Sequence, residues 1–196
     1  MNNQTTTTTP GHIILIHGAS SAGKSTQAVA VQQQIDIPLL HISFDLFIDG
    51  RILPMERFRN GTFSWSSVRP NVMDGLHQTW KALALAGNNL IIDHIVETEA
   101  EMYKLVRLLS GMDVFFVGLH CSLEELERRE IQRGNRRKGE ARTDFQTVHT
   151  FTIYDLELDS ELASVEENTD RLIRAWRDRK RPNAFDRIAQ MDTLSK

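Results

Sequence analysis

Short apolar runs separated by longer stretches of helical character organise this sequence. The runs cover residues 12–16, 39–42, 90–92 and 114–119 and are rich in Ile, Val, Leu and Phe. Strands that are buried on both faces of a parallel sheet have this composition and length. Because the runs alternate with helical stretches from the start of the chain, the pattern predicts an α/β fold with right-handed crossovers.

Helix starts between the runs are marked by Ser or Thr followed three residues later by Glu, which is the signature of a capping box. These pairs are Thr98 and Glu101, Ser122 and Glu125, and Ser164 and Glu167. After the last pair, apolar residues recur at helical spacing as far as Trp176, and we expect this helix to end before Pro182. Residues 50–70 lack clean periodicity. We expect them to form an irregular excursion over one end of the sheet, where folds of this type hold their substrates.

Composition narrows the class of protein further. The 196 residues are 40% hydrophobic and 25% charged, with a formal net charge of -3. This supports a single domain with a buried core, and the acidic balance disfavours binding of nucleic acid through the overall field. A single cysteine, Cys121, excludes an internal disulfide framework and suits the reducing cytoplasm. Since no apolar run approaches the roughly 20 residues of a membrane helix, we expect a cytoplasmic protein that does not enter the membrane.

The clearest motif directly follows the first apolar run. It fits the pattern G-x-x-x-x-G-K-[ST], and its residues are Gly18, Ala19, Ser20, Ser21, Ala22, Gly23, Lys24 and Ser25, followed by Thr26. Between a predicted strand and a helical stretch that extends to about Gln34, this pattern predicts a phosphate-binding loop. Its glycines let the backbone wrap around phosphate oxygens, with the N–H groups of the loop and the helix N-terminus as donors. We expect residues 18–26 to bind ATP, with Lys24 at the β- and γ-phosphates and the Ser25 hydroxyl on Mg²⁺.

Two aspartates come directly after apolar runs, at strand ends that form the active edge of an open α/β sheet. Asp93 follows residues 90–92 and resembles a Walker B aspartate that orients Mg²⁺, with a capping or turn aspartate as the alternative. Asp45 follows the second run and is placed to accept a proton from an acceptor hydroxyl. The alternative for Asp45 is a helix N-cap, and the two roles can coexist.

Basic residues concentrate after the helix that is predicted to follow Ser122. They are Arg128, Arg129, Arg133, Arg136, Arg137, Lys138 and Arg142. Because Gly134 and Gly139 interrupt this segment, it predicts an arginine-bearing lid that closes over ATP, excludes water and stabilises charge on the transferred group. The alternative is a solvated basic helix.

Five blocks of the sequence together resemble the chloramphenicol 3-O-phosphotransferase-like family of small P-loop kinases. The blocks are 17–25, the strand that ends at Asp45, 90–93, 117–149 and 154–159. The resemblance implies the fold of nucleotide and shikimate kinases, with a five-stranded parallel sheet flanked by helices. We therefore predict a disordered leader over 1–11, a P-loop kinase domain over 12–181 and a C-terminal extension over 182–196.

The resemblance also assigns roles to single residues. It implies that Asp45 is the general base, that Lys24 and Ser25 bind phosphate and Mg²⁺, and that Arg133 and Arg136 are the lid arginines. The family pattern has two acids after the third strand, whereas here Asp93 is followed by His94. His94 is interpreted either as a titrating site residue or as a packed, hydrogen-bonded one. The remaining strand histidines, His17, His41 and His120, are interpreted as structural.

These features predict an ATP- and Mg²⁺-dependent kinase that transfers the γ-phosphoryl group to a hydroxyl of a small molecule, with an antibiotic such as chloramphenicol as a candidate acceptor. A nucleic-acid 5′-hydroxyl kinase is one rival, against which the acidic composition and the lack of a basic stripe with interleaved aromatics count. A nucleotide-binding regulatory protein without catalysis is the other rival. The presence of Lys24, Ser25 and Asp45 argues against it.

Overall fold

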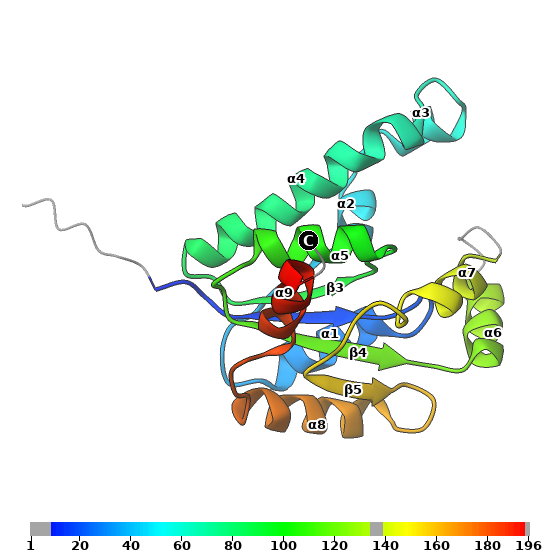
Figure 1. Cartoon of the computed structure of the whole chain (residues 1–196). Helices are drawn as coiled ribbons and strands as arrows, with labels where there is room; N and C mark the ends of the chain where they lie inside the picture. Colours follow the sequence, from blue (N-terminus) through cyan, green and yellow to red (C-terminus); the bar gives the residue numbers. More distant parts are fainter. Residues whose placement is uncertain (1–8, 134–138, 195–196) are drawn as a thin grey trace, which may run out of the picture.

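A five-stranded parallel sheet lies at the centre of the computed structural model, which describes residues 9–133 and 139–194 (Figure 1). The strands are β1 (Ile13–His17), β2 (Leu40–Ser43), β3 (Leu90–His94), β4 (Val114–His120) and β5 (Leu156–Asp159), in the order β2-β3-β1-β4-β5. The first four confirm the strands predicted from apolar runs. An apolar run does not mark β5, because this strand lies at a sheet edge and buries Leu158 while its neighbours stay partly exposed.

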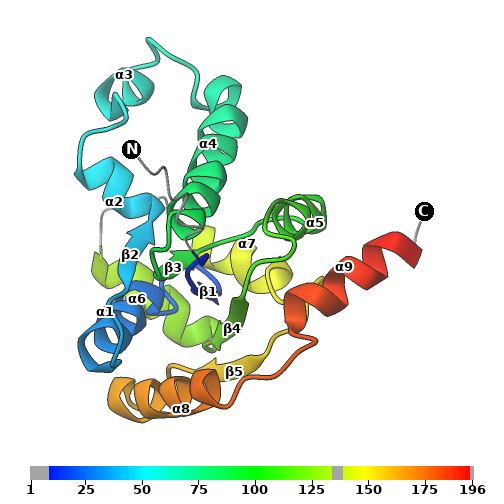
Figure 2. The same ribbon diagram turned by 90° about the vertical axis from the view of Figure 1, so that its left-hand side faces the viewer.

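Helices cover both faces of the sheet (Figure 2). On one face lie α1 (Lys24–Gln34) and α8 (Val165–Arg177), and on the other lie α4 (Trp65–Leu85), α5 (Glu99–Leu108) and α9 (Ala184–Leu194). Alternate side chains of β1 serve the two layers: Ile14 packs on the α1 side, and Ile13 packs with Trp80 on the α4 side. Both layers exclude water, which explains why the strand sequences are continuously apolar.

The two ends of the described chain are tied to this core. Gly11, at the end of the predicted leader, donates its N–H to the Ala84 carbonyl at 2.8 Å. Within the predicted C-terminal extension, Phe185 and Ile188 of α9 are buried against the same cluster as the α4 and α5 side chains. Among the described residues, no helix combines the length and the apolar character needed to cross a membrane.

The predicted helix starts are present, with differences in detail. Ser164 and Glu167 form a complete capping box at the start of α8. Thr98 and Ser122 cap α5 and α6 (Leu123–Arg133) by accepting the backbone N–H three residues on. The glutamates of these two pairs bind elsewhere; the Glu125 carboxylate holds two arginines of α6 itself. In α5 and α6, the glutamate therefore binds another group nearby instead of accepting the backbone N–H of the N-cap residue.

The expectation of an irregular segment over residues 50–70 is wrong in part. After α2 (Phe44–Asp49), the chain forms α3 (Met55–Arg59), and α4 begins at Trp65 and continues through Pro70. Pro70 removes one backbone N–H donor from the helix. The apolar face that follows it, with Leu76 and Trp80 fully buried on the sheet, outweighs that loss. Figure 1 shows α3 and the start of α4 extending beyond the sheet.

Candidate active site

The predicted phosphate-binding loop connects β1 to α1 at the carboxyl ends of the central strands. Two of its glycines are required by geometry. A Cβ atom on Gly18 would lie 2.3 Å from the Leu119 carbonyl oxygen, and Gly23 has a φ of +92°. The Lys24 ammonium donates to the carbonyl oxygens of Gly18 and Ala19 at 2.9 and 2.8 Å. These contacts hold the lysine across the loop, where phosphate would bind.

Ser21 is a strained residue within this loop. Its φ of 66° lies in the left-handed region, which costs a residue with a Cβ about 1–2 kcal/mol. Its hydroxyl is buried and has no hydrogen-bond partner in the described part of the chain. Such costs accumulate at sites that bind ligands.

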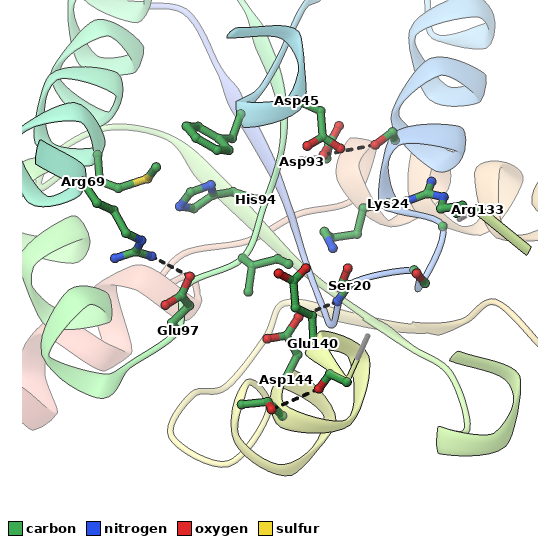
Figure 3. A pocket seen from close by; sticks show the side chains of 18 of the residues that line it. Ser20, Lys24, Asp45, Arg69, Asp93, His94, Glu97, Arg133, Glu140 and Asp144 are labelled. Atoms are coloured by element: carbon green, nitrogen blue, oxygen red, sulfur yellow. Dashed lines mark hydrogen bonds and ion pairs between the residues drawn. The ribbon is translucent and has the colours of Figure 1, made fainter. Parts of the chain in front are cut away.

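One cavity of about 650 Å³ opens above the loop (Figure 3). It brings together eight of the residues predicted from the sequence. They are Ser20, Ser21, Gly23, Lys24, Ser25, Asp45, Asp93 and Arg133. They come from the loop, from two neighbouring strand ends and from the end of α6. Arg136, the second predicted lid arginine, lies outside the described residues.

Asp93 and Ser25 form the part of this cavity that suits a magnesium ion. Asp93 is the fourth residue of β3 rather than a cap or turn residue, and its side chain is 7% exposed. One carboxylate oxygen accepts a hydrogen bond from the Ser25 hydroxyl at 3.3 Å, and the other lies 2.6 Å from the His41 Nε2. No group of three or more His, Cys, Asp or Glu among the described residues could hold a metal alone. A hydroxyl and a carboxylate fit Mg²⁺, which takes one or two protein ligands together with phosphate oxygens and water.

Asp45 lies in the first turn of α2. Ser43 is the N-cap of that helix, since its hydroxyl accepts the Leu46 N–H at 3.2 Å. The alternative reading of Asp45 as an N-cap is therefore wrong. Figure 3 shows the Asp45 side chain directed into the cavity.

The far side of the cavity combines apolar side chains with an ion pair. Phe44 and Trp65 lie with their ring centroids 5.8 Å apart, and Met73 is a third apolar side chain on this side. Arg69 bonds to Glu97 at 2.5 Å. These residues have no role predicted from the sequence, because the aromatic residues within 50–70 follow no period that would place them on one face.

His94 lines the same wall. Of the two interpretations given for it, the structure supports the packed, hydrogen-bonded residue. Its Nε2 lies 3.1 Å from the Nε2 of His77, and both rings contact Trp80. Burial lowers the pKa of His94 well below its usual value, and the neighbouring His77 lowers that pKa further. Burial also lowers the pKa of His77 to about 4. The pair is therefore neutral at physiological pH.

Next to the predicted lid, α7 (Glu140–Thr147) contacts the phosphate-binding loop. One carboxylate oxygen of Asp144 accepts the Ser20 backbone N–H at 2.8 Å (Figure 3). The buried Glu130 of α6 accepts the N–H groups of Gly139 and Ala141, both at 2.9 Å, and these bonds lower its pKa. The start of α7 is thereby fixed to α6, while its acidic side faces the loop. Asp144 is not predictable from the sequence, because a single acidic residue in a polar helix belongs to no motif.

A hydrogen-bonded chain lies beneath the loop, as expected for His17. Its Nε2 donates to the Val96 carbonyl at 3.2 Å, so its Nδ1 accepts the Tyr154 hydroxyl at 2.8 Å. The Tyr154 oxygen then accepts from the His149 Nδ1 at 2.6 Å. Burial lowers the pKa of His17 to about 3 and that of His149 to about 4, which keeps both rings neutral.

A family model described as chloramphenicol phosphotransferase-like protein matches residues 11–177 of the chain. The protein belongs to this family. A relative in two strains of Mycobacterium tuberculosis, provisionally named as an O-phosphotransferase, is 32% identical in an alignment of 197 positions that covers 91% of this chain and 88% of the relative.

Solved structures show the same fold at lower identity. The Mycobacterium tuberculosis APS kinase in complex with AMPPNP and APS has a TM-score of 0.64 and 19% identity, over 85% of this chain and 97% of that one. The shikimate kinase of Bacteroides thetaiotaomicron has a TM-score of 0.59 and 16% identity, over 82% of this chain and 95% of that one. The chloramphenicol phosphotransferase-like chain therefore has the P-loop kinase fold that its sequence predicts, and it is a P-loop phosphotransferase.

Proposed function

We propose that the protein is an ATP- and Mg²⁺-dependent kinase that phosphorylates a hydroxyl group of a small molecule in the cytoplasm. The observation that carries this proposal is the shared cavity of Lys24, Ser25, Asp93 and Asp45. It combines phosphate-binding, metal-binding and proton-accepting groups at one sheet edge. Membership of the chloramphenicol phosphotransferase-like family supports it.

In this proposal, the chain acts mainly by positioning and by charge. The loop N–H groups and the Lys24 ammonium hold the triphosphate, and Arg133 contacts the transferred group from the end of α6. Ser25 and Asp93 would hold Mg²⁺, which neutralises charge on the phosphates. Asp45 accepts the proton of the acceptor hydroxyl. The oxygen of that hydroxyl attacks the γ-phosphorus in line, and ADP leaves.

Two neighbouring cavities serve the two substrates. A second cavity of about 360 Å³ shares Ser21, Gly23 and Arg133 with the first. It is also lined by Thr26, Val165 and Asn168, and we assign it to the nucleoside. The wall with Phe44 and Trp65 then receives the acceptor. Its aromatic surface beside the Arg69–Glu97 ion pair suits an amphipathic alcohol, and chloramphenicol is the first compound to test.

The test is mass spectrometry of chloramphenicol and a pool of hydroxyl-bearing antibiotics and sugars after incubation with the protein, ATP and Mg²⁺. We expect one product heavier by a phosphoryl group, with ADP formed in equal amount. Omission of Mg²⁺ is the control and should prevent the reaction. ADP formation at the same rate with and without every acceptor would contradict transfer to a small molecule.

A further inference from the structure

The two oxygens of the Asp93 carboxylate have different partners. One lies 2.6 Å from the His41 Nε2, and the other accepts the Ser25 hydroxyl at 3.3 Å. The Asp93 and His41 side chains are 7% and 13% exposed, so water competes little for either group. Because an ionised carboxylate only accepts hydrogen bonds, the His41 Nε2 carries the proton and donates it.

The sheet register explains how His41 reaches this aspartate. On the parallel strands β2 and β3, Ser43 pairs with Asp93 and His41 pairs with Ile91. Side chains two residues apart on a strand share a face, so His41 lies diagonally opposite Asp93 on the same face. Ile91 packs with α1 residues on that face, and Ser25 stands in the first turn of α1. The three side chains therefore form a row from β2 through β3 to α1.

His41 is not among the described residues that line the cavity, whereas Asp93 and Ser25 both line it. We propose that His41 is a positioning residue for Asp93: its N–H group fixes one carboxylate oxygen, so that the other faces Ser25 and the Mg²⁺ bound with ATP. This inference rests on the proposed function, because it concerns the metal side of the same site. It gives a role to a histidine that strand position alone marks as structural.

Removal of the donor would release the carboxylate. The terminal torsion of Asp has a broad, two-fold profile, so it defines no orientation by itself. Loss of a hydrogen-bond partner behind a metal ligand typically weakens metal binding about 10- to 100-fold. The expected effect therefore concerns Mg²⁺ and not ATP alone.

The experiment is calorimetric measurement of ATP affinity with and without Mg²⁺, for the whole chain and matched variants. His41→Ala should bind Mg²⁺-free ATP like the wild type and lose about 10- to 100-fold in affinity when Mg²⁺ is present. His41→Gln places an amide N–H near the position of Nε2 and should restore most of the loss. The control is His12→Ala, which breaks a similar pair with Asp113, 2.7 Å long, at the opposite end of β1. It should change neither affinity.

A double-mutant cycle separates action through Asp93 from an independent effect. In an Asp93→Asn background, His41→Ala should cost much less than in the wild type, because its target is already altered. Equal losses in both backgrounds would overturn the proposal. The proposal would also be overturned if Mg²⁺ changed the ATP affinity of His41→Ala as much as that of the wild type, or if His41→Ala weakened ATP binding equally with and without Mg²⁺. A wild type whose ATP affinity does not depend on Mg²⁺ would overturn it as well. These measurements need no acceptor, so failure to find a phosphorylated product is a separate result.

Discussion

Ser21 is a single residue of the phosphate-binding loop whose conformation destabilises the folded chain. It combines a left-handed backbone with a buried hydroxyl that lacks a partner in the described chain. Glycine adopts this conformation without strain, whereas serine does not. Neither property is visible in the sequence, where Ser20 and Ser21 are equivalent letters of one motif.

The first prediction concerns this strain. Ser21→Gly should raise the free energy of unfolding by about 0.5–1 kcal/mol, because glycine has no Cβ atom and adopts the left-handed conformation without steric strain. Urea denaturation measures the change. Ser20→Gly is the matched control and should give no gain, since the backbone of Ser20 is not left-handed. A gain of the same size in both variants would contradict the role of strain at Ser21.

Motif spacing predicts residues of the site only where a strand or loop fixes their direction. Lys24 could be placed by the spacing of the phosphate-binding motif, and Asp45 and Asp93 because each comes after a recognisable apolar run. His41 could not be assigned to Asp93, because their contact depends on the register between β2 and β3.

Among the elements, α7 has a consequence for nucleotide binding. Its Asp144 carboxylate accepts a loop N–H that lies in the phosphate-binding motif. An ionised carboxylate there repels an incoming triphosphate by about 1 kcal/mol or more, depending on how far water screens it. Asp144→Asn keeps an oxygen acceptor for the Ser20 N–H and removes the charge.

The second prediction is that Asp144→Asn binds ATP about 3- to 10-fold more tightly than the wild type, which corresponds to about 1 kcal/mol. Titration calorimetry at low salt checks this value, and high salt should shrink the difference. Asp49→Asn, an exposed change at the end of α2, is the charge-matched control. Weaker ATP binding in Asp144→Asn would show that the carboxylate supports the nucleotide site.

The helix α9 follows the residues that match the family model, yet it packs against the core of the domain. The family model stops at residue 177, yet Phe185 is 5% exposed and lies with its ring centroid 5.2 Å from that of Phe116. The sequence predicts residues 182–196 only as an extension, because they lie past the usual end of the family that the chain resembles, and a resemblance says nothing about residues beyond its end.

The third prediction follows from this burial. Phe185→Ala should lower the free energy of unfolding by about 3–5 kcal/mol, the usual cost of removing a buried ring. Phe145→Ala is the control, because that ring is 42% exposed on α7, and it should cost well under half as much. Thermal or urea unfolding compares the two. Equal small losses would mean that α9 contributes little to the core.

On the scale of the whole molecule, the alternation of apolar runs and helices predicts the sheet and its two layers, because burial on both faces leaves a strong pattern. The same reasoning fails for the segment from α2 to the start of α4. There the chain extends beyond the sheet, and the aromatic side chains Phe44 and Trp65 line a cavity instead of packing on a regular face. This wall of the cavity is therefore the part of the site that the sequence predicts least.

The buried histidines give the whole molecule a pH-dependent stability. The folded pKa values of His17, His77 and His149 are about 3, about 4 and about 4, and that of His94 lies well below its ordinary value of 6.5. Below pH 6.5, the unfolded chain binds protons that the folded chain excludes, so stability falls as pH falls and is fully present above about 6.5. Each histidine contributes about 1.4 kcal/mol per pH unit in this window.

The fourth prediction is that the free energy of unfolding falls by about 5 kcal/mol between pH 7.5 and 5.5, mainly through these four histidines, at about 1.4 kcal/mol each. Urea denaturation at both pH values measures the difference. His149→Asn should reduce that pH dependence, even though it lowers stability at pH 7.5. A stability that is constant over this range would contradict the neutral, buried state of these rings.

The proposed phosphoryl transfer takes place in one cavity with Asp45 as the proton acceptor, so the rate of transfer by Asp45→Asn is the decisive measurement. With ATP, Mg²⁺ and the acceptor found by mass spectrometry, this variant should bind ATP normally and transfer phosphate at least about 100-fold more slowly than the wild type. Asp49→Asn, on the same helix and exposed, should transfer at the wild-type rate. Wild-type turnover in Asp45→Asn would show that Asp45 is not the proton acceptor and would overturn the proposed mechanism.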